Sequence, residues 1–332
     1  MSHTLWWKNP WLAWTVKLLI GVILIALLFT TVDLRSVFRT FASSSVPLCI
    51  AAYLGMLLIT TLNALQLRWC MANQDIALPL ARGIEIQLVA MLYGLVTPSA
   101  IGAGAVKWYK LSDSGRYRAQ AAAVLVYLRA ANTVILLSLA CVALLWERRI
   151  DSGYIRALTA VLLAASFLLF LTLCSNRFAT TVGLGIHGKA SRRLPQALTS
   201  AIGRLWTAFE ALSRLPKSRL AAILSLSLLI EASGIAVFLL LARAVGLDIP
   251  LLALAWLRLI IIVVQLPPVS IAGLGMREGA LVLLLPELYG AASEQALALS
   301  FLLLGRRIFL GLLGGLCEIM RAFHRPSERL SS

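Results

Sequence analysis

Residues 266–278 read LPPVSIAGLGMRE and interrupt a largely apolar part of the chain with two prolines, two glycines, an arginine and a glutamate. Proline lacks a backbone donor and glycine adds backbone freedom, so this stretch predicts a break in any helix that enters it. Peptide groups freed in this way are costly in lipid. We therefore expect the second break, as we call 266–278, to be shielded by other helices or to line a wet cavity. The residues expected to break the helix are Pro267, Pro268, Gly273 and Gly275.

The chain around the second break has the composition of a membrane protein. Of its 332 residues, 60% are hydrophobic and 13% are charged, whereas soluble domains have about 45–50% apolar and about 25% charged residues. Six apolar runs are candidate full spans: 18–32, 46–65, 120–146, 155–174, 220–242 and 295–320. The runs 84–96, 251–265 and 279–285 are shorter than the roughly 20 residues that a span needs. We predict an all-α polytopic membrane protein, a helical bundle of six full spans plus two broken, re-entrant segments.

A first break, 97–111 (TPSAIGAGAVKWYKL), resembles the second. Isoleucine, glycine and a basic residue follow the proline at similar distances in both segments, with Pro98 and Lys107 at the ends of the pattern in the first. Such interrupted segments in corresponding positions of two halves are typical of transporter binding sites. Halves 46–146 and 220–320 would then form an inverted repeat within a single membrane domain, although a chance match is not rare in a chain this rich in Gly, Ile and Leu. The helix-breaking residues expected in the first break are Pro98, Gly102 and Gly104.

The formal net charge is +16, from 30 Lys and Arg against 14 Asp and Glu. With both breaks re-entrant and both termini cytoplasmic, most of the basic residues fall on the cytoplasmic side, as the positive-inside rule requires. Affinity for anionic lipid headgroups is also compatible with this excess. The loop 175–219 would be the largest basic cytoplasmic segment. Within it, 202–215 has apolar residues at helical spacing and predicts either an interfacial helix or a loop helix packed on the protein.

Several site classes are excluded. The five cysteines form no CxxC pair and the three histidines are far apart, so we expect no metal site and no cofactor. The basic residues are dispersed between spans without a nucleic-acid-binding motif, so we expect no nucleic acid partner. Residues 182–191, VGLGIHGKAS, carry glycine-rich spacings without the strand–turn–helix context or the Ser/Thr of a phosphate loop. We expect no nucleotide.

Ionisable residues within apolar runs are costly and therefore informative, from about 2.5 kcal/mol upward on insertion scales. One interpretation is a cavity in which arginines bind a phosphate or carboxylate headgroup, oriented by glutamates. The alternative is internal ion pairing that fixes helix packing. Basic groups outnumber acids, which favours an anionic ligand, whereas Arg258 is expected to reach the interface. The candidate headgroup-binding residues are Lys107, Arg129, Arg277, Glu278, Arg306, Arg307 and Glu231, with the hydroxyls of Ser99 and Ser270.

Three features together resemble the lysylphosphatidylglycerol synthase transmembrane region family. They are the Arg68–Trp69 pair, PSAIGAGAVK (98–107), and 266–285 with its LP, GLG and Arg-Glu followed by an apolar run. The resemblance covers essentially the whole chain and implies a stand-alone, flippase-like membrane domain. The first half departs from the family pattern: Gly104 replaces an expected acid, Lys107 an expected arginine, and Leu128 the acid before Arg129. Any ion-coupling role of that half is thereby in doubt.

The resemblance implies lipid translocation or a supporting role for enzymes of lipid and glycan assembly. Our leading hypothesis is a bacterial-type inner-membrane flippase or transporter for an anionic phospholipid or lipid-linked precursor. One half would move against the other in alternating access. The alternatives are a membrane-embedded lipid transferase and a non-catalytic membrane partner of a lipid or glycan synthase.

Overall fold

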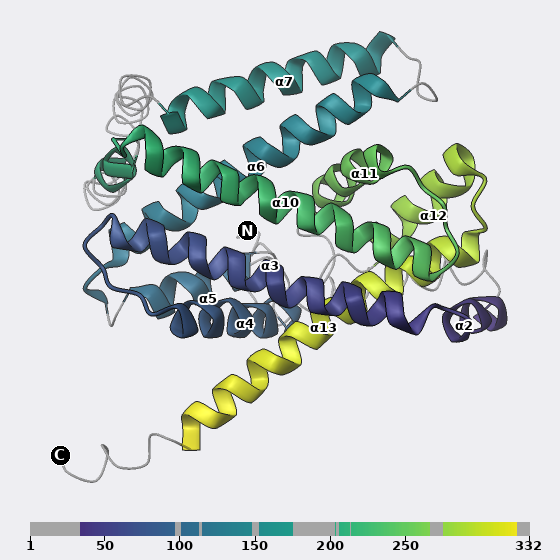
Figure 1. Ribbon diagram of the computed structural model, residues 1–332, viewed down its shortest axis with the longest axis horizontal. Helices are drawn as coiled ribbons and strands as arrows, with labels where there is room; N and C mark the ends of the chain where they lie inside the picture. The colour runs from purple at the N-terminus through teal and green to yellow at the C-terminus, as the bar shows by residue number, and fades with distance from the viewer. Residues whose placement is uncertain are drawn as a thin grey trace, which may run out of the picture. The chain divides into compact units, whose positions relative to one another are not determined.

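A computed structural model describes residues 34–96, 101–112, 115–147, 153–174, 203, 206–212, 214–265 and 275–323. Within these residues the regular elements are helices, and five helices are long and apolar enough to span a membrane. They are α3 (Val46–Ala72), α6 (Arg118–Trp146), α7 (Gly153–Cys174), α10 (Lys217–Ala244) and α13 (Ser293–Phe323) (Figure 1). The prediction of an all-helical, multi-pass membrane protein is confirmed. The expected span at 18–32 lies outside the described residues.

The shorter helices surround the two breaks or precede a span. They are α2 (Leu34–Ala42), α4 (Leu80–Val96), α5 (Ile101–Leu111), α11 (Leu251–Val264) and α12 (Met276–Tyr289) (Figure 1). Helix α2 was not predicted, because a nine-residue segment with two arginines resembles a polar loop. Helix α3 continues to Ala72, so the predicted end at residue 65 is wrong. The polar interruption that begins after residue 65 starts inside the helix, where Gln66 is buried and bonded to α10.

The chain forms two compact units. Unit 1 comprises residues 1–56, 88–103 and 236–332, and unit 2 comprises 57–87 and 104–235. The division falls within α3, α4, α5 and α10. Each of the predicted repeat halves contributes segments to both units, and the inverted repeat itself remains a prediction.

In unit 1, α13 packs against α12 and α2. Val37 of α2 and Leu297 of α13 form a small buried cluster with Val282 and Phe301 packed against it. Further along, α13 comes very close to α4: a Cβ on Gly314 would lie 2.2 Å from the carbonyl oxygen of Leu88. Only glycine permits this approach of two backbones.

Gly311 and Gly315 have the GxxxG spacing that permits close helix packing, and only one of them makes a close contact. A Cβ on Gly311 would lie 2.5 Å from Leu95, whereas one on Gly315 would lie 4.0 Å from its nearest neighbour, which is an ordinary contact. The closest approach belongs to Gly314, three residues after Gly311. At that position the neighbour is backbone, which cannot move aside as a side chain can.

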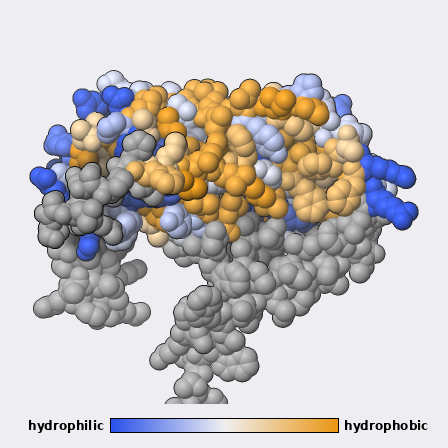
Figure 2. Space-filling model, turned by 90° about the horizontal axis from the view of Figure 1, so that it is seen from below, coloured by the Kyte–Doolittle hydropathy of each residue, from blue (hydrophilic) through white to orange (hydrophobic). Residues whose placement is uncertain are grey.

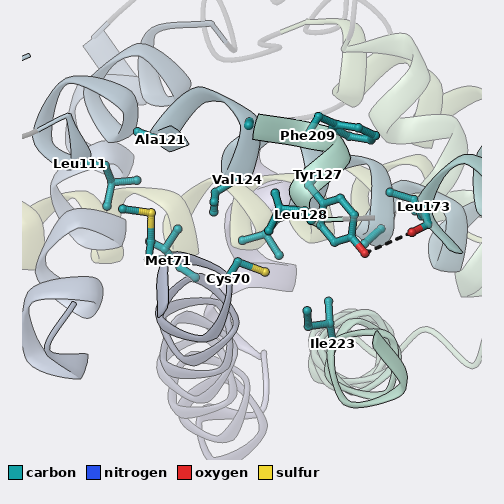
Figure 3. Packing of buried hydrophobic residues seen from close by; sticks show 14 of the residues in the cluster. Cys70, Met71, Leu111, Ala121, Val124, Tyr127, Leu128, Leu173, Phe209 and Ile223 are labelled. Carbon is teal, nitrogen blue, oxygen red and sulfur yellow. Dashed lines mark hydrogen bonds between the residues drawn. The ribbon is translucent and has the colours of Figure 1, made fainter. Parts of the chain in front are cut away.

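Unit 2 has an aromatic and aliphatic core around Tyr127 of α6 (Figure 3). The ring of Tyr127 packs edge to face on Phe209 with centroids 5.6 Å apart, and its hydroxyl donates to the carbonyl of Leu173, 3.5 Å away. Phe209 and Leu212 belong to a short helix at 206–212 and are buried in this core. Of the two interpretations of 202–215, packing on the protein is therefore the one that the described part supports.

Large apolar side chains remain exposed along the spanning helices. On α3, Ile50, Leu54 and Leu58 are each more than half exposed and lie four residues apart, on one helix face. On α7, Val161 and Phe167 are similarly exposed. Apolar residues predominate among the coloured atoms in Figure 2. A continuous apolar stripe exposed on a long helix is what a lipid-facing surface requires.

Candidate functional site: an arginine cluster beside the second break

The second break ends at a helix start that is fixed by backbone geometry and by one carboxylate. Gly275 precedes α12 with φ of 83°, a left-handed conformation that favours glycine. Its N–H donates to Oε2 of Glu278 at 2.8 Å. A carboxylate three residues into a helix satisfies a free N–H and interacts favourably with the positive end of the helix dipole. Glu278 therefore defines where the chain becomes helical again.

Glu278 also neutralises a buried arginine. Arg277 and Glu278 are 2% and 1% exposed, and the Arg277 guanidinium donates through Nη2 to Oε1 of Glu278. Arg277 Nε donates to Ser300 Oγ at 2.7 Å, and Ser300 Oγ donates to Glu278 Oε1 at 2.9 Å. The three side chains form a closed hydrogen-bonded triad between α12 and α13, which compensates the cost of burying both charges.

The other end of the second break is also attached to α13. Gln265 follows α11 directly, and its Oε1 accepts a hydrogen bond from Arg307 Nη2 at 2.8 Å. Ser300 and Arg307 are seven residues apart, so they lie on one face of α13, about 10 Å apart along its axis. One face of α13 thus binds Gln265, directly before the second break, through Arg307, and Arg277 and Glu278, at the end of the break, through Ser300.

Arg306, next to Arg307, is incompletely satisfied. Its Nη1 contacts the sulfur of Met56 at 3.6 Å, a weak acceptor. Its Nε is buried and has no hydrogen-bond partner among the described residues, and the same holds for Nε2 of Gln265. Two buried donors at one end of the break are therefore available to an acceptor.

Four arginines interact electrostatically beside the second break. Arg306 experiences electrostatic repulsion from Arg258, Arg277 and Arg307, and Arg307 is repelled by Arg277 and attracted by Glu278. We call Arg258, Arg277, Arg306 and Arg307 the arginine cluster; all four belong to unit 1. Glu278 is the carboxylate that pairs with Arg277, so the cluster with Glu278 has a net positive charge. Such a cluster stabilises phosphate or carboxylate groups.

The remaining predicted residues that the structure describes belong to unit 2 or to the first break. Lys107 and Arg129 belong to unit 2, where Arg129 repels Lys107; Lys107 is half-buried and Arg129 is exposed. Glu231 is buried in unit 2, within α10. Gly102 and Gly104 lie within α5, so their assignment as helix-breaking residues is wrong: the helix tolerates them, and the first break ends before Ile101. The predicted residues outside the described part are Ser99, Ser270, Pro98, Pro267, Pro268 and Gly273.

Three members of the site were missed from the sequence. Arg258 was expected to reach the interface, but it is half-buried and close enough to Arg306 to repel it. Ser300 looks like one of many small residues in an apolar helix; only its spacing of seven from Arg307 indicated a shared face. Gln265 was read as the polar end of an apolar run, and its position directly before the prolines was the available signal.

Comparison with known families agrees with this architecture. The model of the lysylphosphatidylglycerol synthase TM region matches residues 14–315. The chain belongs to this family. The match covers the first predicted span, both breaks and most of α13. The resemblance seen in the sequence is thereby confirmed, and the chain is a membrane protein of a lipid-related, flippase-like family. A search of curated proteins found no match.

Proposed function

We propose that this member of the lysylphosphatidylglycerol synthase TM region family translocates an anionic phospholipid or lipid-linked precursor across a bacterial-type cytoplasmic membrane. The ligand's phosphate or carboxylate binds at the arginine cluster of unit 1. Arg306 and Arg307 provide the donors, and the Arg277–Glu278–Ser300 triad holds the end of the break in place beside them. Lys107 and Arg129 belong to unit 2, and the site proposed here is confined to residues of unit 1.

The single observation that carries the proposal is the surplus of buried donors and positive charge in unit 1. Arg306 Nε and Gln265 Nε2 have no acceptor among the described residues, and three other arginines lie close enough to raise the potential at Arg306. If ion pairing only fixed helix packing, the donors would be matched by acceptors, because unmatched buried groups are costly. An oxyanion supplies both the missing acceptors and the missing negative charge.

The test is lipid translocation by Arg306→Gln. We expect reconstituted wild-type protein to accelerate the translocation of fluorescent phosphatidylglycerol relative to empty vesicles, measured by dithionite protection. Arg306→Gln removes the charge but retains a polar side chain, and should reduce the rate about tenfold or more, as expected for loss of a charged hydrogen bond. Arg243→Gln is the matched control: Arg243 is an exposed arginine of the same unit, at the end of α10.

Other outcomes separate the alternatives. If Arg306→Gln lowers thermal stability while translocation stays normal, the arginine cluster is a packing device and the proposal is wrong. A chemically changed lipid in the mass spectrum of the vesicle extract would indicate a transferase instead. Wild-type protein that neither moves nor changes lipid, but copurifies with a synthase, would indicate a non-catalytic partner.

A further inference from the structure

Unit 2 contains a cavity of about 450 Å³ where α3 ends and α10 begins. Trp69 and Ala72 line it from the end of α3 and Asn73 from the residue after it, and Ser218, Arg219, Ala222 and Ile223 line it from α10. Its size is within the usual range for small-molecule sites. None of these residues belongs to the arginine cluster, which lies in unit 1.

The cavity lies at the end of two spanning helices, where the chain turns polar. Helix α3 ends at Ala72 and is followed by polar Asn73, Gln74 and Asp75, while α10 starts with Lys217. Trp69, one turn before the end of α3, is 40% exposed. A partly exposed tryptophan followed by polar residues at a helix end is typical of the headgroup region of a membrane. The cavity therefore opens at the depth of lipid headgroups.

The lining combines one cation with apolar walls. Arg219 is exposed, and its Nη1 donates to Asn73 Oδ1. This bond ties the guanidinium at the start of α10 to the residue that follows α3 and leaves its other donors for a ligand. Ile223, only 1% exposed, and the half-buried Ala222 provide an apolar floor, and the exposed Ala72 adds apolar surface at its edge. Among the described residues that line the cavity none is acidic. A positioned guanidinium over an apolar floor suits a phosphate with attached hydrocarbon.

We propose that this cavity binds the phosphate headgroup of an anionic phospholipid from the adjoining leaflet, with Arg219 on the phosphate and Trp69 beside the glycerol and upper acyl chain. It is a second lipid site, with residues different from those of the proposed translocation site. Its function does not depend on whether the protein translocates lipid. A surface site of this kind would retain anionic lipid around unit 2.

Tryptophan quenching tests the proposal directly, since Trp69 lines the cavity. The full-length protein is reconstituted in vesicles that contain either phosphatidylglycerol or phosphatidylcholine with bromine near the headgroup end of the acyl chains. The Trp69 signal is obtained by subtracting the fluorescence of Trp69→Phe. We expect Trp69 to be quenched at about fivefold lower mole fraction of brominated phosphatidylglycerol than of brominated phosphatidylcholine, and this preference to vanish in Arg219→Gln.

Two controls distinguish binding in the cavity from non-specific attraction of anionic lipid to a basic protein. Arg214→Gln removes the same charge from an exposed position nearby that does not line the cavity, and the preference should remain. Adding millimolar inorganic phosphate should leave the quenching unchanged; relief by free phosphate would show a site for phosphate itself and overturn the lipid assignment. Equal quenching by the two lipids, or equal losses in Arg214→Gln and Arg219→Gln, would also overturn the proposal.

Discussion

Each unit buries a hydrogen-bonded set of polar side chains, and the two sets differ in chemistry. The set in unit 1 is charged: Arg277 and Glu278 are almost inaccessible, and Arg306 and Arg307 both interact electrostatically with Arg277. Unit 2 buries one carboxylate, Glu231, and also a neutral amide, Gln66. Gln66 Nε2 donates to Ser227 Oγ at 2.6 Å, the carbonyl of Ile223 at 3.2 Å and Asn132 Oδ1 at 3.3 Å. We call Gln66, Asn132 and Ser227 the glutamine network.

The two sets also differ in which of their buried polar atoms lack a hydrogen-bond partner. In unit 1 the open groups among the described residues include the donors Arg306 Nε and Gln265 Nε2, whereas in the glutamine network the open group is an acceptor, Gln66 Oε1. Open donors with excess positive charge call for an anion. An open neutral acceptor is satisfied by a single water. The comparison supports the anion site proposed for unit 1, and it assigns the glutamine network a role in helix association.

The largest effect on stability should come from removing Glu278. Glu278→Ala leaves Arg277 buried without its charge partner and frees the N–H of Gly275. Breaking one side of a buried pair costs about 3–5 kcal/mol, which should appear as a lower free energy of unfolding in detergent denaturation. Glu287→Ala, which removes an exposed carboxylate from the same helix, should change it by less than about 0.5 kcal/mol. Equal stability of both variants would show that the triad does not hold α12 to α13.

A smaller effect should follow from Gln66→Leu. The substitution preserves bulk but leaves the acceptors of the glutamine network without their donor, at a cost of about 1–3 kcal/mol. Translocation, corrected for folded protein, should stay at the wild-type rate, in contrast to Arg306→Gln. The double variant Gln66→Leu/Ser227→Ala should recover part of the loss, because removing both partners avoids an unsatisfied group. Loss of translocation in a stable Gln66→Leu protein would contradict the comparison.

The smallest effect should come from Tyr127→Phe in the apolar core of unit 2. The ring and its contact with Phe209 remain, and only the long hydrogen bond to Leu173 is lost. We expect a decrease of about 0.5 kcal/mol in the free energy of unfolding, the low end for a hydrogen bond. Tyr154→Phe, at a tyrosine that is 89% exposed on α7, serves as the reference with no change. A decrease above about 2 kcal/mol would show that the core of unit 2 also depends on a polar contact.

Apolar run length predicted the spanning helices well. The runs 120–146, 155–174 and 220–242 correspond to α6 (Arg118–Trp146), α7 (Gly153–Cys174) and α10 (Lys217–Ala244), because lipid requires long apolar helices. The prediction was wrong after residue 65, where a polar stretch was taken as the end of a span, and at Gly102, which was predicted to break a helix. Gln66 and Gly102 both occur inside helices, and Gln66 is tolerated because α6 and α10 provide its acceptors.

The sequence by itself determined that this is a helical membrane protein of the lysylphosphatidylglycerol synthase TM region family, that the chain breaks before Arg277, and that arginines exceed acids near the break. Composition and local residue order decide these properties, since the cost of polar groups in lipid acts residue by residue. Only the tertiary structure decided which charges meet. Arg277 pairs with its neighbour Glu278, but Ser300, Gln265 and Arg258 reach the site from two other helices. Such contacts depend on how α11, α12 and α13 pack, and helix packing is set by side-chain shape across the whole unit rather than by any single stretch.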